Sequence, residues 1–176
     1  MEVEVEFRSI IDKARYGELM LFFKKNASYL GRDSQVTHYL DDKGQLRLQK
    51  STRGAKIWLK QGALHKTEHE EIEVGISSKD FKTVAKIFEL AGKPIRVTWY
   101  RLRHTFLWKG VSIMLDYTRG YGYIAEFEVM CTQQKVSLAK KKIKEMMDRL
   151  NLNPTPKSNF DKKYSQYLKK WSNPGS

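Results

Sequence analysis

Charged and apolar residues alternate strictly at the start of the chain, in the segment MEVEVEFR of residues 1–8. Successive side chains of a strand point to opposite faces, so one face carries Glu2, Glu4, Glu6 and Arg8 and the other carries apolar groups. Three neighbouring carboxylates repel one another, and an exposed surface would scatter them. The pattern predicts a strand whose charged face lines a wet interior that holds a metal cation or a row of basic groups.

The same alternation recurs further along the chain, with charges of one sign on each face. Any one such strand fits a sheet with one face in solvent, but exposed faces usually mix both signs with Ser, Thr and Gln. A closed antiparallel barrel with a charged lumen accounts for all of the strands together. The same-sign faces carry Lys56 with Lys60, Glu71 with Glu73, Arg101 with Arg103, and Glu126 with Glu128, and a further strand ends at Asp116.

Helical spacing of apolar residues predicts helices over 9–25, with Ser9 as N-cap, and over about 81–90, 136–150 and 160–171. Further strands are predicted at 35–40, 45–50, 95–108, 111–116 and 122–130, and DDKG at 41–44 is typical of a hairpin turn. The chain is therefore expected to be an α+β protein with one domain over residues 1–171. Residues 172–176 are expected to form a disordered tail.

Composition narrows the class of ligand. The chain has 33 Lys and Arg against 20 Asp and Glu, a net charge of +13 that favours polyanionic ligands. The lysine-rich segment KKKIK at 140–144 is a candidate surface for nucleic acid, although a solvated helix face explains it more simply. No apolar run has membrane-spanning length, so we expect no membrane partner. Cys131 is the single cysteine, which excludes an internal disulfide and fits a reducing cytoplasm.

Assembled in order, the alternating segments resemble the CYTH proteins, a branch of the triphosphate tunnel metalloenzymes. The resemblance runs from Glu2 to about Leu168 and rests on EVEVEFR, LRLQ, KIWLK, EIEV, RLR and LDYTRGYGYIAEFEV. It implies a closed antiparallel barrel of about eight strands that forms a charged tunnel. It also implies hydrolysis or rearrangement of triphosphates with Mg²⁺ or Mn²⁺.

Some positions depart from the family pattern. In one alignment Glu6 replaces the lysine of a Glu-x-Glu-x-Lys opening. A shift by two residues instead makes Glu4, Glu6 and Arg8 similar to the Glu-x-Glu-x-Arg opening of tunnel-type RNA triphosphatases. Gln49 stands where many relatives carry an arginine, and Thr37 stands where they carry an aspartate.

The residue types suggest roles within such a tunnel. Arginine binds phosphate oxygens bidentately and lysine supplies a point charge, which predicts a phosphate-binding set of Arg8, Arg47, Lys56, Lys60, Arg101 and Arg103. Mg²⁺ prefers carboxylate oxygens, which predicts metal ligands among Glu2, Glu4, Glu71, Glu126 and Glu128. Catalytic roles, such as orienting water, are expected for Glu4, Glu6, Glu73 and Asp116. The alternative for each residue is a salt bridge without chemistry.

Four functions follow from these residues and from the resemblance. The first is divalent-metal-dependent hydrolysis of inorganic triphosphate, or of an organic triphosphate such as thiamine triphosphate or a nucleotide. The second is cyclisation of ATP to cyclic AMP, as in class IV adenylyl cyclases. The third is removal of phosphate from an RNA 5′-triphosphate end, and the fourth is a non-catalytic polyanion-binding module.

Overall fold

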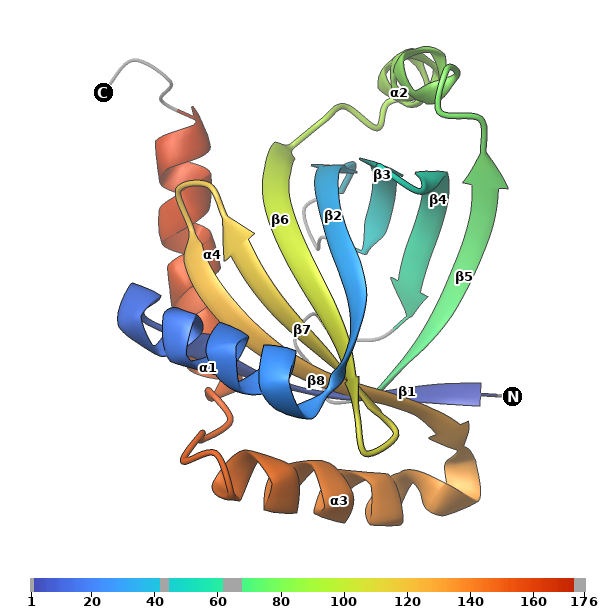
Figure 1. Ribbon diagram of the computed structural model, residues 1–176. Coiled ribbons are helices and arrows are strands. Elements are labelled where there is room, and N and C mark those ends of the chain that lie inside the picture. Colours follow the sequence, from blue (N-terminus) through green and yellow to red (C-terminus); the bar gives the residue numbers. More distant parts are fainter. Residues whose placement is uncertain (1, 42–44, 62–67, 173–176) are drawn as a thin grey trace.

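A computed structural model describes residues 2–41, 45–61 and 68–172 of the chain. Within these ranges the side chains of residues 2, 60, 61, 68–71, 171 and 172 are not described. The described part is an α+β structure, as predicted, with one antiparallel sheet and four α-helices (Figure 1). No helix in these ranges is long and apolar enough to cross a membrane.

Eight strands of the described residues form a strongly curled half-barrel in the order β1-β5-β4-β3-β2-β6-β7-β8 (Figure 1). All pairings are antiparallel, and β8 also pairs along the whole length of β1. We call the concave face of this sheet the lumen. The strands are β1 (Glu2–Ile11), β2 (Ser28–Tyr39), β3 (Leu46–Ser51), β4 (Gly54–Gln61), β5 (Glu68–Ile76), β6 (Val97–Trp108), β7 (Val111–Thr118) and β8 (Gly122–Thr132).

The sheet closes less completely than predicted. The pairing order returns from β5 to β1, but in the described residues these strands meet only where Glu4 faces His69 and Val5 faces Glu68. Figure 1 shows β5 diverging from β1 beyond this point. The expectation of a fully closed barrel is therefore corrected to a half-barrel that is open along most of this seam.

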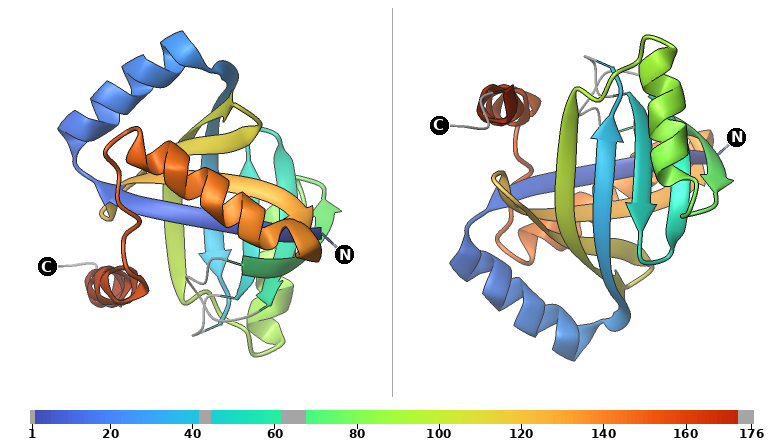
Figure 2. Two further views of the ribbon diagram at one scale, coloured as in Figure 1. Left: turned by 90° about the horizontal axis from the view of Figure 1, so that it is seen from below. Right: turned by 90° about the horizontal axis from the view of Figure 1, so that it is seen from above.

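Because the lumen is polar, the hydrophobic core lies on the outside of the sheet, beneath the helices. The apolar face of β1, with Val5 and Phe7, packs under α3, as alternation requires. A second cluster lies under α2 and a third under α4. Figure 2 shows α3 crossing β1 and β8 on one side of the molecule and α2 lying beyond β3 and β4 on another. The helices are α1 (Lys13–Asn26), α2 (Phe81–Leu90), α3 (Val136–Asp148) and α4 (Lys157–Ser172).

Several predicted boundaries differ from the structure; for example, β2 begins at Ser28 rather than at residue 35. β1 continues to Ile11, so Ser9 is a strand residue whose hydroxyl donates to the Asn153 carbonyl at 2.7 Å. The N-cap of α1 is Asp12, whose carboxylate accepts from the Arg15 amide at 2.7 Å. Helix α4 includes Ser172, the first residue of the predicted tail, and the rest of that tail lies outside the described residues.

Candidate functional site

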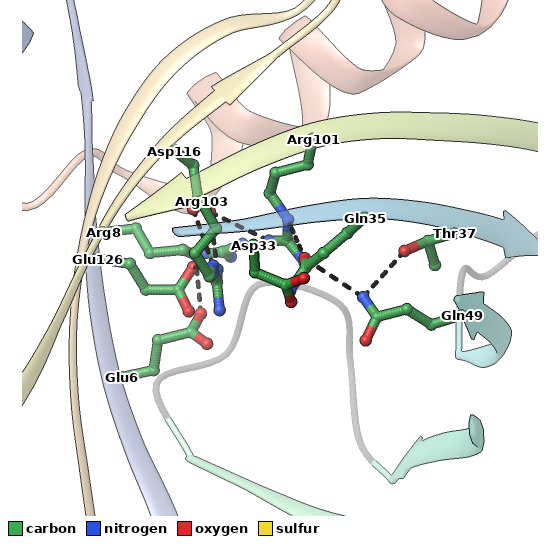
Figure 3. A network of polar contacts seen from close by, with 10 residues as sticks. All are labelled: Glu6, Arg8, Asp33, Gln35, Thr37, Gln49, Arg101, Arg103, Asp116 and Glu126. Atoms are coloured by element: carbon green, nitrogen blue, oxygen red, sulfur yellow. Dashed lines mark hydrogen bonds and ion pairs between the residues drawn. The ribbon is translucent and has the colours of Figure 1, made fainter. Parts of the chain in front are cut away.

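A buried ion-pair network joins the neighbouring strands β7 and β6 on the wall of the lumen (Figure 3). Asp116 of β7 lies opposite Arg103 of β6 in the strand register and accepts two hydrogen bonds from its guanidinium, at 2.7 and 2.8 Å. Arg101 donates a further bond at 3.1 Å to the same carboxylate. Burial alone would raise the pKa of Asp116, but Arg103 and Arg101 lower it below its ordinary value, so the carboxylate is ionised.

Both arginines keep donors for a ligand. The bonds to Asp116, Gln35 and Glu126 use Nε and Nη1 of Arg101 and Nε and Nη2 of Arg103. Within the described residues, Nη2 of Arg101 and Nη1 of Arg103 donate no hydrogen bond. These two N–H groups can donate hydrogen bonds to the oxygens of an anion that enters the lumen.

Glu126 of β8 lies beside this network and carries an unusual protonation equilibrium. Its carboxylate is 3.1 Å from Nη2 of Arg103. Burial, with the nearby negative charges of Glu6 and Asp116, raises the pKa of Glu126 to about 7, even though Arg103 opposes the shift. Glu126 can therefore exchange a proton near neutral pH.

Three carboxylates gather next to Glu126, on β1 and β8. One oxygen from each of Glu4, Glu6 and Glu128 lies within 4.8 Å of the others, and Glu4 and Glu6 are buried. Glu6 also pairs with Arg8 Nε at 2.8 Å. A cluster of carboxylate oxygens is the ligand set that Mg²⁺ and Mn²⁺ prefer, so these residues fit a divalent cation. Metal binding was predicted for Glu4, Glu126 and Glu128. Of these, Glu126 pairs with Arg103 and does not join this group of described carboxylates, whereas Glu6, predicted to be catalytic, does.

A polar extension of the network lies on β2 and β3, and the sequence reasoning did not identify it as part of the site (Figure 3). Gln35 accepts from Arg101 Nε at 2.8 Å and donates to Asp33 at 2.9 Å. Gln49 donates to Thr37 at 3.0 Å and to Gln35 at 3.4 Å. The signal was available, because Asp33, Gln35 and Thr37 alternate along β2 in the same way as the charges on other strands.

Two further predicted phosphate ligands, Arg47 and Lys56, form a separate group around Trp58. The Arg47 guanidinium lies 4.5 Å from the centre of the Trp58 ring and 4.8 Å from that of Tyr39. Lys56 lies 5.0 Å from the Trp58 ring and pairs with Glu73. The Glu73 side chain is 55% exposed, so it does not join the buried carboxylates. The side chains of Glu2, Lys60 and Glu71, which were also predicted to act here, lie outside the described residues.

A cavity of about 250 Å³ adjoins the network. Its wall includes Arg103 of the ion-pair network and Glu128 of the carboxylate group. The other lining residues are Asp33, Gln35, Arg53, Thr105, Ser112 and Met114.

Helix α4 lies elsewhere on the sheet, where Phe160 and Tyr167 pack with Trp99 and Tyr121 in a buried cluster.

Comparison of the fold identifies its type. No model of a protein family and no curated protein matches the sequence. Solved structures do match, including a conserved hypothetical protein of Pyrococcus furiosus with a TM-score of 0.73 and 22% identity, over 88% of this chain and 97% of that one. The chain has a CYTH-like, triphosphate-tunnel fold.

Two other solved structures with this fold have a described activity or assignment. A candidate adenylyl cyclase of Hippeastrum, described as having a dominant triphosphatase activity, matches with a TM-score of 0.67 and 18% identity, over 94% of this chain and 96% of that one. A candidate adenylate cyclase of Vibrio parahaemolyticus matches with a TM-score of 0.69 and 16% identity, over 94% and 97%. At these identities the likeness establishes the fold alone.

Proposed function

We propose that the protein is an enzyme that hydrolyses a triphosphate in its lumen with the help of Mg²⁺ or Mn²⁺. The observation that carries the proposal is the position of the Glu4, Glu6 and Glu128 carboxylates close to the arginine network, in which Arg103 interacts with the charge of Glu128 and binds Glu126 at 3.1 Å. Carboxylates provide ligands for a hard cation and arginines bind phosphate oxygens, and a metal-bound triphosphate needs both. The triphosphatase activity described for the Hippeastrum protein supports the same proposal.

Each group of residues then has a distinct task. Arg101 and Arg103 bind phosphate oxygens through the N–H groups that their bonds to Asp116 leave available. Asp116 holds both guanidinium planes in place, so that little reorganisation is needed when the anion binds. Glu126, with a pKa of about 7, would accept a proton from the water that attacks the terminal phosphorus, while the P–O bond to the rest of the substrate breaks and releases phosphate.

Glu4, Glu6 and Glu128 would hold the cation. When bound, such a cation neutralises charge on the phosphate oxygens and lowers the pKa of its water. Arg8 lies against Glu6 at 2.8 Å and offsets part of the repulsion among the three carboxylates before the ligands arrive.

The test measures which product appears from which substrate. The purified protein is incubated with tripolyphosphate, thiamine triphosphate, ATP and 5′-triphosphorylated RNA, each with Mg²⁺, with Mn²⁺ and with excess chelator. Release of phosphate that needs the cation supports the proposal. Release of pyrophosphate with cyclic AMP identifies a cyclase instead, phosphate from RNA alone identifies an RNA 5′-triphosphatase, and binding without turnover identifies a polyanion-binding module.

A variant pair ties the activity to the site. Glu128→Gln removes one carboxylate of the cation group, and we expect it to lower turnover at least tenfold at limiting Mn²⁺. Glu89→Gln is the matched control, because Glu89 forms an exposed ion pair with Lys86 on α2. Full turnover in excess chelator, or equal turnover in the two variants, contradicts the proposal.

A further inference from the structure

In the polar network on β2, the donor and acceptor of each hydrogen bond can be assigned, beginning at Asp33. Its Oδ1 accepts from the Thr52 amide at 2.9 Å and from the Thr52 hydroxyl at 2.6 Å. Burial alone would raise the pKa of Asp33, but its hydrogen bonds from Thr52 and Gln35 lower it. An ionised carboxylate only accepts hydrogen bonds, so the Gln35 atom that faces Asp33 Oδ2 at 2.9 Å is its amide nitrogen.

The orientation of Gln35 is set from its other side as well. Arg101 has only donors, and its Nε lies 2.8 Å from the Gln35 side chain, so the atom that faces it is the carbonyl oxygen. A carboxylate on one side and a guanidinium on the other therefore allow one orientation of this amide.

This orientation determines that of Gln49 in turn. The Gln35 oxygen also faces the Gln49 side chain at 3.4 Å, so Gln49 presents its amide nitrogen there and donates to the Thr37 hydroxyl at 3.0 Å with the same nitrogen. The Gln49 carbonyl oxygen accepts no hydrogen bond from any described residue. Figure 3 shows it pointing away from Gln35 and Thr37.

The chemical character of the network changes along its length. Glu6, Glu126 and Arg8 lie at one end in Figure 3, Arg103, Asp116 and Arg101 follow, and Gln49 and Thr37 lie at the other end. If a triphosphate binds its cation at the carboxylates and its oxygens at the arginines, and lies along this order of residues, its attached group is directed toward Gln49. A carbonyl oxygen repels phosphate oxygens and accepts from N–H or O–H groups.

We propose, on the basis of the proposed function, that the Gln49 carbonyl oxygen accepts a hydrogen bond from the organic part of a triphosphate ester. The site then selects esters whose organic part carries a hydroxyl or amino group over inorganic triphosphate. In a nucleotide this donor is a ribose hydroxyl or the amino group of the base.

The experiment compares substrates with and without the donor. Steady-state kcat/KM is measured with Mn²⁺ for tripolyphosphate, ATP, 2′,3′-dideoxy-ATP, which lacks both ribose hydroxyls, and purine riboside triphosphate, which lacks the amino group. We expect Gln49→Met to lower kcat/KM for ATP about tenfold, the effect of one lost hydrogen bond, and to change that for tripolyphosphate less than twofold. The effect of Gln49→Met should disappear with the analogue that lacks the donor.

Asn26→Leu is the matched control, because it also replaces a side-chain amide with an apolar group, and the exposed Asn26 amide donates to the Phe22 carbonyl on α1, outside the network. It should preserve the ratio of kcat/KM for ATP to that for tripolyphosphate. The inference is overturned if Gln49→Met lowers kcat/KM equally for ATP and tripolyphosphate, or if it lowers kcat/KM for both ATP analogues as much as for ATP. Either result leaves the proposed function standing. If neither substrate is turned over, the proposed function fails, and dissociation constants of ATP and tripolyphosphate for the same variants decide the role of Gln49.

Discussion

Arg103 donates two hydrogen bonds to Asp116, from Nε to Oδ1 at 2.8 Å and from Nη2 to Oδ2 at 2.7 Å. The Asp116 side chain is 1% exposed, and Arg101 binds the same carboxylate. One buried carboxylate therefore binds two guanidinium groups in the wall of the lumen. The pair both stabilises the fold and orients the candidate phosphate ligands.

We expect Asp116→Asn to lower the free energy of unfolding by about 3 kcal/mol, because breaking a buried ion pair leaves an uncompensated charge. Urea unfolding at neutral pH measures the change. Glu89→Gln, which breaks an exposed pair with Lys86, should change the same quantity by less than about 1 kcal/mol. Equal effects of the two variants would mean that the Asp116 pair is as weak as a surface pair.

The raised pKa of Glu126 predicts how stability depends on pH. In the folded protein the pKa is about 7, against an ordinary value of 4.5, so between these values the folded state binds more protons than the unfolded state. Stability contributed by this group is therefore present below pH 4.5 and is lost as the pH rises toward 7. We expect Glu126→Gln to remove this fall in the free energy of unfolding between pH 4.5 and pH 7.

The measurement is the free energy of unfolding at pH 5 and pH 8 in excess chelator. Relative to Glu126→Gln, the wild type should be less stable at pH 8 than at pH 5, by on the order of 1 to 3 kcal/mol. Parallel pH profiles of the two proteins would show that Glu126 has the same affinity for protons in the folded and unfolded states.

Strand alternation was sufficient to predict which faces carry charge. A period of two places Glu4 and Glu6 on one side of β1 and Val5 on the other, and Val5 is buried in the core beneath α3. Arg103 and Asp116, which are 13 residues apart, meet because β6 and β7 form a hairpin in register. Local sequence carries this information, since parity and a short turn fix both the face and the partner.

Other features depend on contacts between distant segments. Glu73 has the parity of a lumen residue, yet it is largely exposed because β5 diverges from β1. Ser9 has the side chain of an N-cap, but the ladder with β8 extends β1 beyond it, and Asp12 caps α1 instead. The role of Gln35 depends on a partner 66 residues away, which no local pattern specifies.

Tyr167 provides a test of how α4 is anchored on the sheet. Its hydroxyl donates to the Thr98 carbonyl at 3.0 Å in a buried position, so Tyr167→Phe leaves that carbonyl without this partner. We expect the free energy of unfolding to fall by about 1 kcal/mol. Tyr117→Phe, at a ring that is 39% exposed, is the control and should have a smaller effect on urea unfolding.

The last prediction concerns Glu6, which either replaces a phosphate-binding lysine or belongs to the cation site. Its carboxylate lies within 4.8 Å of Glu4 and Glu128, and it pairs with Arg8 at 2.8 Å. A lysine at this position would place a positive charge among the carboxylates, repel a divalent cation and also repel Arg8. We therefore expect Glu6→Lys to abolish metal-dependent turnover rather than to improve phosphate binding.

Hydrolysis rate against Mn²⁺ concentration distinguishes the two alternatives. If Glu6 is a ligand, Glu6→Lys should remain inactive at concentrations that saturate the wild type, and Mn²⁺ binding measured by calorimetry should weaken at least tenfold. If Glu6 only replaces a phosphate-binding lysine, the variant should be more active than the wild type at low Mn²⁺. Glu73→Lys is the control, since Glu73 is exposed and pairs with Lys56 outside the carboxylate group, and its curve should follow that of the wild type. Curves for Glu6→Lys that match the control would place Glu6 outside the site, because a reversal of charge among metal ligands cannot leave cation affinity unchanged.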